Sequence, residues 1–153
     1  MNRIEVRRIS GMMENVFDGA AWHGPSIMGV LNKISPEQAY KSNVHIRSVC
    51  ELVRHMTSWK VFAVERLKGN NDFEITEKEN WKKNSMDNPL IWNEIINDLR
   101  DSHKQLLDTL EHINDEKLSE EVEGKAYDFY TLLHGVMQHD LYHLGEIVLL
   151  SKL

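Results

Sequence analysis

Two of the eight histidines, His139 and His143, stand four positions apart in the stretch HDLYH. In a helix, side chains with this spacing lie one turn apart on the same face, so both imidazoles can reach a single ion. A third histidine, His55, lies in another apolar stretch with helical periodicity. Neutral imidazole is a preferred ligand of zinc, nickel and ferrous iron. The three histidines therefore favour a site for one divalent metal ion.

The simplest alternative is a set of neutral core histidines, each hydrogen-bonded to the backbone or to another side chain. A single buried histidine would favour that alternative. Three imidazoles on inward faces change the balance, because they are costly to bury without a shared partner. Spacing alone leaves both interpretations open.

Two known metal motifs can be compared with this pattern. HDLYH has the histidine spacing of a zinc-protease helix, but Asp140 stands where that motif has its glutamate base, and the chain ends soon after, at Leu153. A di-iron carboxylate bundle needs Glu-x-x-His pairs, and no glutamate of this chain has a histidine three residues later. The remaining interpretation is a mononuclear site with three neutral imidazoles and open positions, suited to zinc, nickel or ferrous iron.

The elements that must position these histidines are predicted to be long helices. Apolar residues recur at helical spacing, and the chain contains only 8 Gly and 3 Pro residues. Ser35-Pro36 is a typical helix start, and Gly69 a typical helix end. The predicted helices cover residues 43–68, 88–113 and 127–150, with a further helix before Gly19 and a short one after Ser35, while residues 70–86 and 120–125 are predicted connections.

Two of these helices have inward positions that alternate at spacings of three and four. They are Leu52, His55, Trp59 and Phe62 in one helix, and Leu132, Val136, His139, His143, Glu146 and Leu150 in the last. This pattern is typical of a helical bundle. We expect an all-α fold, an antiparallel four-helix bundle with a short extra helix and a long connection, in a single domain over residues 1–153. Gly135 and Gly145 interrupt the last helix, and we expect two helices to approach closely there.

The composition narrows the range of partners and compartments. The 153 residues are 41% hydrophobic and 27% charged, as in ordinary globular domains. A net charge of −6 argues against nucleic acid, because affinity for phosphate comes largely from Lys and Arg. Cys50 is the single cysteine, which excludes an intramolecular disulfide and fits a reducing compartment. With no apolar run near 18 residues, we expect a cytoplasmic protein without membrane or nucleic-acid partners.

Three stretches together resemble the DinB-like (also called YfiT-like) four-helix-bundle metalloenzymes. They are WHGPS at 22–26, ELVRHMTSW at 51–59 and HGVMQHDLYHLGEI at 134–147. The resemblance extends from about residue 10 to the end of the chain. It implies a divalent metal, most simply zinc or nickel and alternatively iron, on one histidine of the second helix and an H-x-x-x-H pair of the fourth. In this chain those ligands are His55, His139 and His143.

The resemblance also implies an activity. Characterised relatives are thiol-dependent transferases or isomerases that use small thiols such as bacillithiol, mycothiol or glutathione. By this likeness we expect a small-molecule substrate, a low-molecular-weight thiol as co-substrate and a homodimer. The alternatives are a metal-dependent hydrolase and a non-catalytic, metal-stabilised bundle that binds a small molecule or a partner.

Three further residues are candidates for moving protons at such a site. His23 stands in a turn, where it either faces the open metal position or is tied to its own backbone. Tyr142 precedes a candidate ligand and is either a proton donor or a packing residue. Glu146 stands where relatives tend to have Gln, and its carboxylate could accept a proton or act as an extra ligand. The other histidines are not expected to bind the ion. We expect them to be structural, to be exposed to solvent, or to lie behind the ligands: they are His45, His103, His112 and His134.

Overall fold

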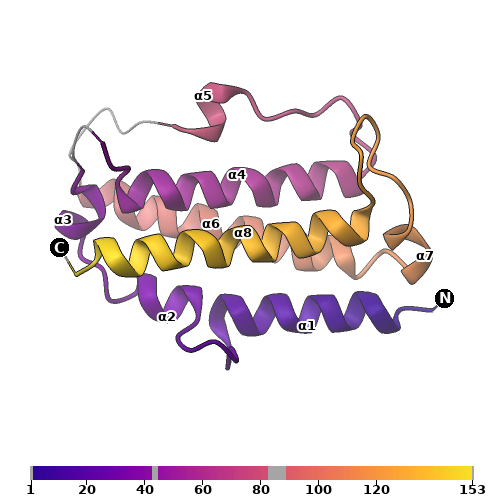
Figure 1. Ribbon diagram of the computed structural model, residues 1–153, viewed down its shortest axis with the longest axis horizontal. Helices are drawn as coiled ribbons and strands as arrows, with labels where there is room; N and C mark the ends of the chain where they lie inside the picture. Colours follow the sequence, from indigo (N-terminus) through magenta and orange to yellow (C-terminus); the bar gives the residue numbers. More distant parts are fainter. Residues whose placement is uncertain (1, 43–44, 83–88, 153) are drawn as a thin grey trace.

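The computed structural model describes residues 2–42, 45–82 and 89–152 (Figure 1). Four long helices form its body: α1 (Ile4–Asp18), α4 (Val49–Leu67), α6 (Pro89–Leu110) and α8 (Phe129–Leu150). Four short helices lie in the connections: α2 (Ile27–Leu31), α3 (Pro36–Tyr40), α5 (Glu77–Asn80) and α7 (Asp115–Leu118). The described residues contain no strand, which confirms the all-α prediction. None of the helices in these ranges is both long and apolar enough to cross a membrane.

The four long helices pack through two apolar clusters, which define their directions. One cluster joins the ends of α4 and α6 to the starts of α1 and α8, with Phe62, Leu110, Val6 and Phe129 among its members. The other joins the starts of α4 and α6 to the ends of α1 and α8, with Val53, Trp92, Phe17 and Ile147 among its members. Helices α4 and α6 therefore run in one direction, and α1 and α8 run in the other.

The bundle predicted from sequence is thus present, with two parallel pairs, α4 with α6 and α1 with α8. Helix α4 is antiparallel to α8 and to α1, whereas α4 and α6 lie side by side in the same direction (Figure 1). Because α4 and α6 are parallel and are successive long helices, the chain between them needs a long return connection, and the chain after Gly69 supplies it. This connection passes along the upper edge of Figure 1 and carries α5, which packs on α4.

Helix α4 begins later in the chain than predicted, because a capping box sets its first residue. Helix α4 begins at Val49, and the predicted start at residue 43 lies outside the described residues. The Ser48 hydroxyl accepts a hydrogen bond from Glu51 N at 3.2 Å, and the Glu51 carboxylate accepts one from Ser48 N at 2.9 Å. This capping box satisfies two backbone donors and begins the helix there. His45 consequently lies in a turn before α4 rather than on the helix.

The connection predicted over residues 70–86 contains a short helix. A capping box formed by Thr76 and Glu79 begins α5 there. The expected close approach of helices at Gly135 and Gly145 is wrong, since a Cβ atom at either position would meet no atom of another helix within 4 Å. The space at these glycines is open.

The interior contains polar side chains between the helices. Lys60 of α4 and Asp140 of α8 form a fully buried ion pair. His103, one of the histidines expected to be structural or solvated, is only 6% exposed and stacks on the ring of Phe17, with centroids 3.8 Å apart. Burial, followed by the positive charge of Lys60, lowers the pKa of His103 to about 3. His103 is therefore a neutral core residue at physiological pH.

Candidate metal centre

Three histidines from two helices bring their imidazoles to one point. His55 Nε2 lies 2.9 Å from His139 Nε2, which lies 3.1 Å from His143 Nε2. One nitrogen from each ring lies within 4.8 Å of the other two. Two nitrogens bound to one tetrahedral zinc ion are about 3.3 Å apart. The spacing of the three side chains therefore fits a single ion.

The connection that carries α5 holds His55 in place. His55 Nδ1 lies 2.8 Å from the carbonyl oxygen of Asn80, and a carbonyl can only accept, so Nδ1 carries the ring proton. The Trp81 indole stacks on the imidazole, with ring centroids 3.7 Å apart and planes at 9°. Arg47 lies over the other face of that indole, its guanidinium carbon 3.6 Å from the ring centroid. These contacts leave His55 Nε2 with its lone pair facing the other histidines.

Helix α8 supplies the other two imidazoles from successive turns. His143 Nδ1 lies 2.5 Å from Glu146 Oε2, and because a carboxylate accepts, Nδ1 of His143 carries the proton. The carboxylate thus lies on the Nδ1 side of the ring, opposite the nitrogen that faces the cluster. A carboxylate in this position orients a metal-binding histidine and raises its basicity. Glu146 therefore has the geometry of an orienting group behind His143.

The three rings have too few protons to place a hydrogen bond in each of the two short Nε2–Nε2 contacts. The Nε2 atoms of His55 and His143 both present lone pairs to His139 Nε2. A neutral His139 has one ring proton, so at least one of its two contacts has no hydrogen between the nitrogens. His139 Nδ1 is also buried without a hydrogen-bond partner in the described part of the chain. A cation among the three Nε2 atoms would remove this conflict, so the donor set fits a metal.

Burial keeps two of the imidazoles in the form that binds metals. Desolvation is the main cause that lowers the pKa of His55, and the hydrogen bond to Asn80 opposes it. The pKa of His139 falls to about 3, first through burial and then through the neighbouring His143, His55 and Lys60. Both rings are therefore neutral at pH 7, and only neutral imidazole binds a metal ion.

The other candidate residues lie around or away from this cluster. Tyr142 is 69% exposed, and its ring centroid lies 5.1 Å from that of His143. His23 is exposed in the loop between α1 and α2, where its Nε2 lies 3.1 Å from the carbonyl oxygen of Pro25. That loop lies along the lower edge of Figure 1, whereas α5 lies along the upper edge. The His134 ring lies against that of Tyr130, with centroids 4.4 Å apart and planes tilted by 46°.

A cavity of about 320 Å³ opens beside His139. It is lined by Trp59, Tyr127, Thr131, Leu132, Gly135, Val136 and His139. Its walls come from α4, from α8 and from the segment before α8. A small molecule in this cavity would lie against one of the three clustered histidines.

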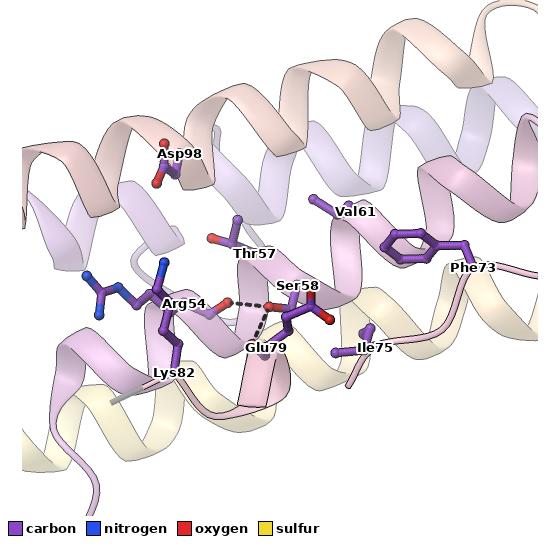
Figure 2. A pocket seen from close by; sticks show the side chains of 9 residues that line it. All are labelled: Arg54, Thr57, Ser58, Val61, Phe73, Ile75, Glu79, Lys82 and Asp98. Carbon is purple, nitrogen blue, oxygen red and sulfur yellow. Dashed lines mark hydrogen bonds between the residues drawn. The ribbon is translucent and has the colours of Figure 1, made fainter. Parts of the chain in front are cut away.

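A second cavity, of about 240 Å³, lies between α4, α6 and the connection that carries α5 (Figure 2). Figure 2 shows Asp98 on α6, Phe73 on the connection and Ser58 on α4, and the Ser58 hydroxyl donates a hydrogen bond to the Glu79 carbonyl at 3.0 Å. Its lining residues include Arg54, Glu79, Lys82 and Asp98, but none of the three clustered histidines. This charged cavity is therefore separate from the candidate metal centre.

Sequence reasoning missed the groups that surround the ligands. Asn80 and Trp81 lie in a polar stretch without periodicity, and the only signal was one large aromatic residue among charged ones. Lys60 follows Trp59 in an apolar stretch, and Asp140 follows His139. Each is therefore a charged residue directly beside a predicted inward position. Opposite charges on two inward faces could have indicated the buried pair.

Comparison with known protein families identifies the family of this chain. The family model of the DinB superfamily matches residues 24–147, which is most of the chain. The protein belongs to the DinB superfamily. No curated protein and no solved structure gives a significant match to the chain.

Proposed function

We propose that the protein binds one divalent metal ion through His55, His139 and His143 and uses it in a reaction on a small molecule. The observation that carries this proposal is the convergence of three Nε2 atoms, with too few ring protons for a hydrogen bond in each of their two short contacts. Asn80 and Glu146, which accept from the Nδ1 atoms of His55 and His143, support the same assignment. Zinc and nickel suit three imidazoles best, and iron is the alternative.

We further propose thiol-dependent S-transfer or isomerisation as the reaction class, on the basis of family membership and the cavity beside His139. A metal held by neutral imidazoles lowers the pKa of a bound thiol and so supplies a thiolate at neutral pH. In S-transfer, the thiol loses its proton, its sulfur bonds to an electrophilic carbon, and the leaving group departs with the electrons of the broken bond. A reducing compartment such as the cytoplasm would keep the thiol available.

The residues around the three histidines would orient the ligands and exclude water from the site. Glu146 would hold the His143 ring through its Nδ1–H, and the stacked Trp81 would exclude water from one face of His55. Tyr142 lies beside His143 with an exposed ring and is the candidate to exchange a proton with the substrate. His23 remains a proton-transfer candidate only if the loop before α2 contributes to the site.

The test is metal analysis of protein purified without a histidine tag, followed by a thiol-transfer screen. We expect one divalent ion per chain, and conjugation of bacillithiol, mycothiol or glutathione to monochlorobimane that a chelator abolishes. Absence of metal at full reconstitution would overturn the metal function. Metal-dependent ester or amide hydrolysis without thiol transfer would favour the hydrolase, and metal without either activity would favour the binding bundle.

A homodimer is the proposed assembly. Ile4, Met12 and Tyr130 are exposed apolar side chains on α1 and α8, and a partner would cover them. Light scattering at micromolar concentration should give twice the chain mass, and a monomer mass would contradict the proposal.

A further inference from the structure

The charged cavity between α4, α6 and the connection that carries α5 has two unlike ends (Figure 2). Arg54 and Lys82 lie at one end, whereas Phe73 and Ile75 lie at the other. Lys82 is exposed and the other three side chains are half-buried, so the cavity is open to solvent at its charged end. A site with one apolar and one charged end suits a small molecule that is itself amphipathic.

Charges of opposite sign stand on opposite walls of this cavity. Lys82 belongs to the connection and Asp98 to α6 (Figure 2). Both side chains are exposed, and neither forms a hydrogen bond or an ion pair with another described residue. The second carboxylate of the lining, Glu79, already accepts hydrogen bonds from Thr76 N at 3.0 Å and from Thr76 Oγ1 at 2.7 Å. The complementary ligand is therefore a zwitterion, with its ammonium toward Asp98 and its carboxylate toward Lys82.

The apolar end and the volume limit the rest of the ligand. Val61, Phe73 and Ile75 supply aliphatic and aromatic surface that is half-buried. The cavity has a volume of about 240 Å³, and a water molecule occupies about 30 Å³ in the liquid. The space therefore holds about eight groups of that size, which corresponds to a molecule of about nine non-hydrogen atoms such as leucine.

The cavity and the candidate metal centre share one segment of the connection. Among four consecutive residues, Glu79 and Lys82 line the cavity, whereas the carbonyl of Asn80 and the indole of Trp81 contact His55. A molecule held between this segment and α6 would therefore restrain the same backbone that orients His55.

We infer that the charged cavity binds an α-amino acid with an apolar side chain, and that the bound molecule restrains residues 79–82 against His55. Its ammonium pairs with Asp98, its carboxylate pairs with Lys82, and its side chain lies at the end formed by Phe73 and Ile75. This site goes beyond the proposed function, because none of its residues is a candidate metal ligand.

Calorimetric titration of the full chain with leucine and three analogues tests the ligand class. Isocaproate lacks the ammonium of leucine, isoamylamine lacks its carboxylate, and glycine lacks its side chain. Leucine should bind most tightly of the four, and glycine about tenfold more weakly, because it buries no apolar groups. The absence of saturable leucine binding, or equal affinities for leucine and glycine, would overturn the inference.

Two exposed substitutions test the charge assignments. Asp98→Asn should weaken leucine binding about two- to fivefold, the effect of losing one exposed ion pair, and leave isocaproate binding unchanged. Lys82→Gln should weaken leucine binding by a similar factor and leave isoamylamine binding unchanged. Asp101→Asn on α6 and Lys78→Gln on α5 change the same charges outside the cavity and should bind leucine as the wild type does. Equal losses in these controls would mean that leucine responds only to the overall charge.

Hydrogen exchange of the backbone amides tests the effect on residues 79–82. In chelator-treated protein, leucine at ten times its dissociation constant should slow exchange in this segment about tenfold, because the ligand must leave before the segment opens. Leucine binding with unchanged exchange there would overturn the restraint on His55. Because no metal is present in this measurement, a chain that binds leucine but no zinc would contradict the proposed function and leave this inference standing.

Discussion

Trp81 lies flat on the imidazole of His55, with ring centroids 3.7 Å apart and planes at 9°. The indole comes from the connection between α4 and α6, so this connection is fastened to a candidate metal ligand. The adjacent Asn80 carbonyl accepts from the same imidazole. The long return connection therefore does more than join two helices, because it sets the orientation and the tautomer of His55.

Replacement of Trp81 should weaken metal binding. Trp81→Ala removes a stacking contact worth about 0.5–1.5 kcal/mol, which corresponds to a loss of about two- to tenfold in zinc affinity. Trp81→Phe keeps a stacked ring and should retain most of it. Competition with a chelating dye measures both. Equal affinities of Trp81→Ala and the wild type would show that the indole does not orient His55.

The three histidines should be required together. His55→Ala, His139→Ala and His143→Ala should each lose the bound ion at equimolar zinc, because two imidazoles on adjacent turns supply only two ligands. His45→Ala and His112→Ala are matched controls outside the cluster. If His55→Ala keeps full occupancy while His23→Ala loses it, the third ligand is the turn histidine instead.

Glu146 should act through His143 rather than as a ligand. Removing the carboxylate in Glu146→Ala should lower metal affinity about 10- to 100-fold, the usual effect of losing such a partner. Glu146→Gln keeps an oxygen that can accept from Nδ1 and should recover part of the loss. Cobalt spectra should show the same ligand set in both variants, and a change in coordination would mean that Glu146 is itself a ligand.

His103 should make the fold sensitive to acid. Its pKa is about 3 in the folded protein and about 6.5 in an unfolded chain, so below pH 6.5 only the unfolded state takes up a proton. This residue's contribution to stability is therefore lost as pH falls from about 6.5 toward 3, at up to about 1.4 kcal/mol per pH unit.

His103→Leu removes that proton uptake while keeping an apolar side chain against Phe17. As the pH is lowered, the free energy of unfolding should fall less in the variant than in the wild type. The metal content should not change. Urea titrations at a series of pH values measure it. A constant difference would mean that His103 is protonated in the folded state.

The buried ion pair should show strong coupling. Lys60→Met or Asp140→Leu alone leaves one buried charge unpaired and should cost about 3–5 kcal/mol. The double variant leaves no charge and should recover most of that loss. A double-mutant cycle from urea unfolding gives the coupling energy, and additive effects would contradict direct pairing of Lys60 with Asp140.

The sequence allowed the helices and the three-histidine cluster to be predicted, because both follow from local periodicity. Spacings of three and four placed His55, His139 and His143 on inward faces, and packing of those faces brought them together. The parallel pairing of α4 with α6 and the contact of Trp81 with His55 could not be predicted in this way. Both depend on the path of a polar connection, and that path has no local pattern.

His55 and His139 are separated by 84 positions along the chain. An ion shared by them therefore bridges distant parts of the polypeptide. In the unfolded chain only His139 and His143 remain close to each other, because they are four residues apart in sequence. Binding that requires the native state stabilises it by mass action, by about 2.7 kcal/mol when the free ion is at one hundred times its dissociation constant. The lifetime of this protein against degradation would then rise and fall with the supply of the metal.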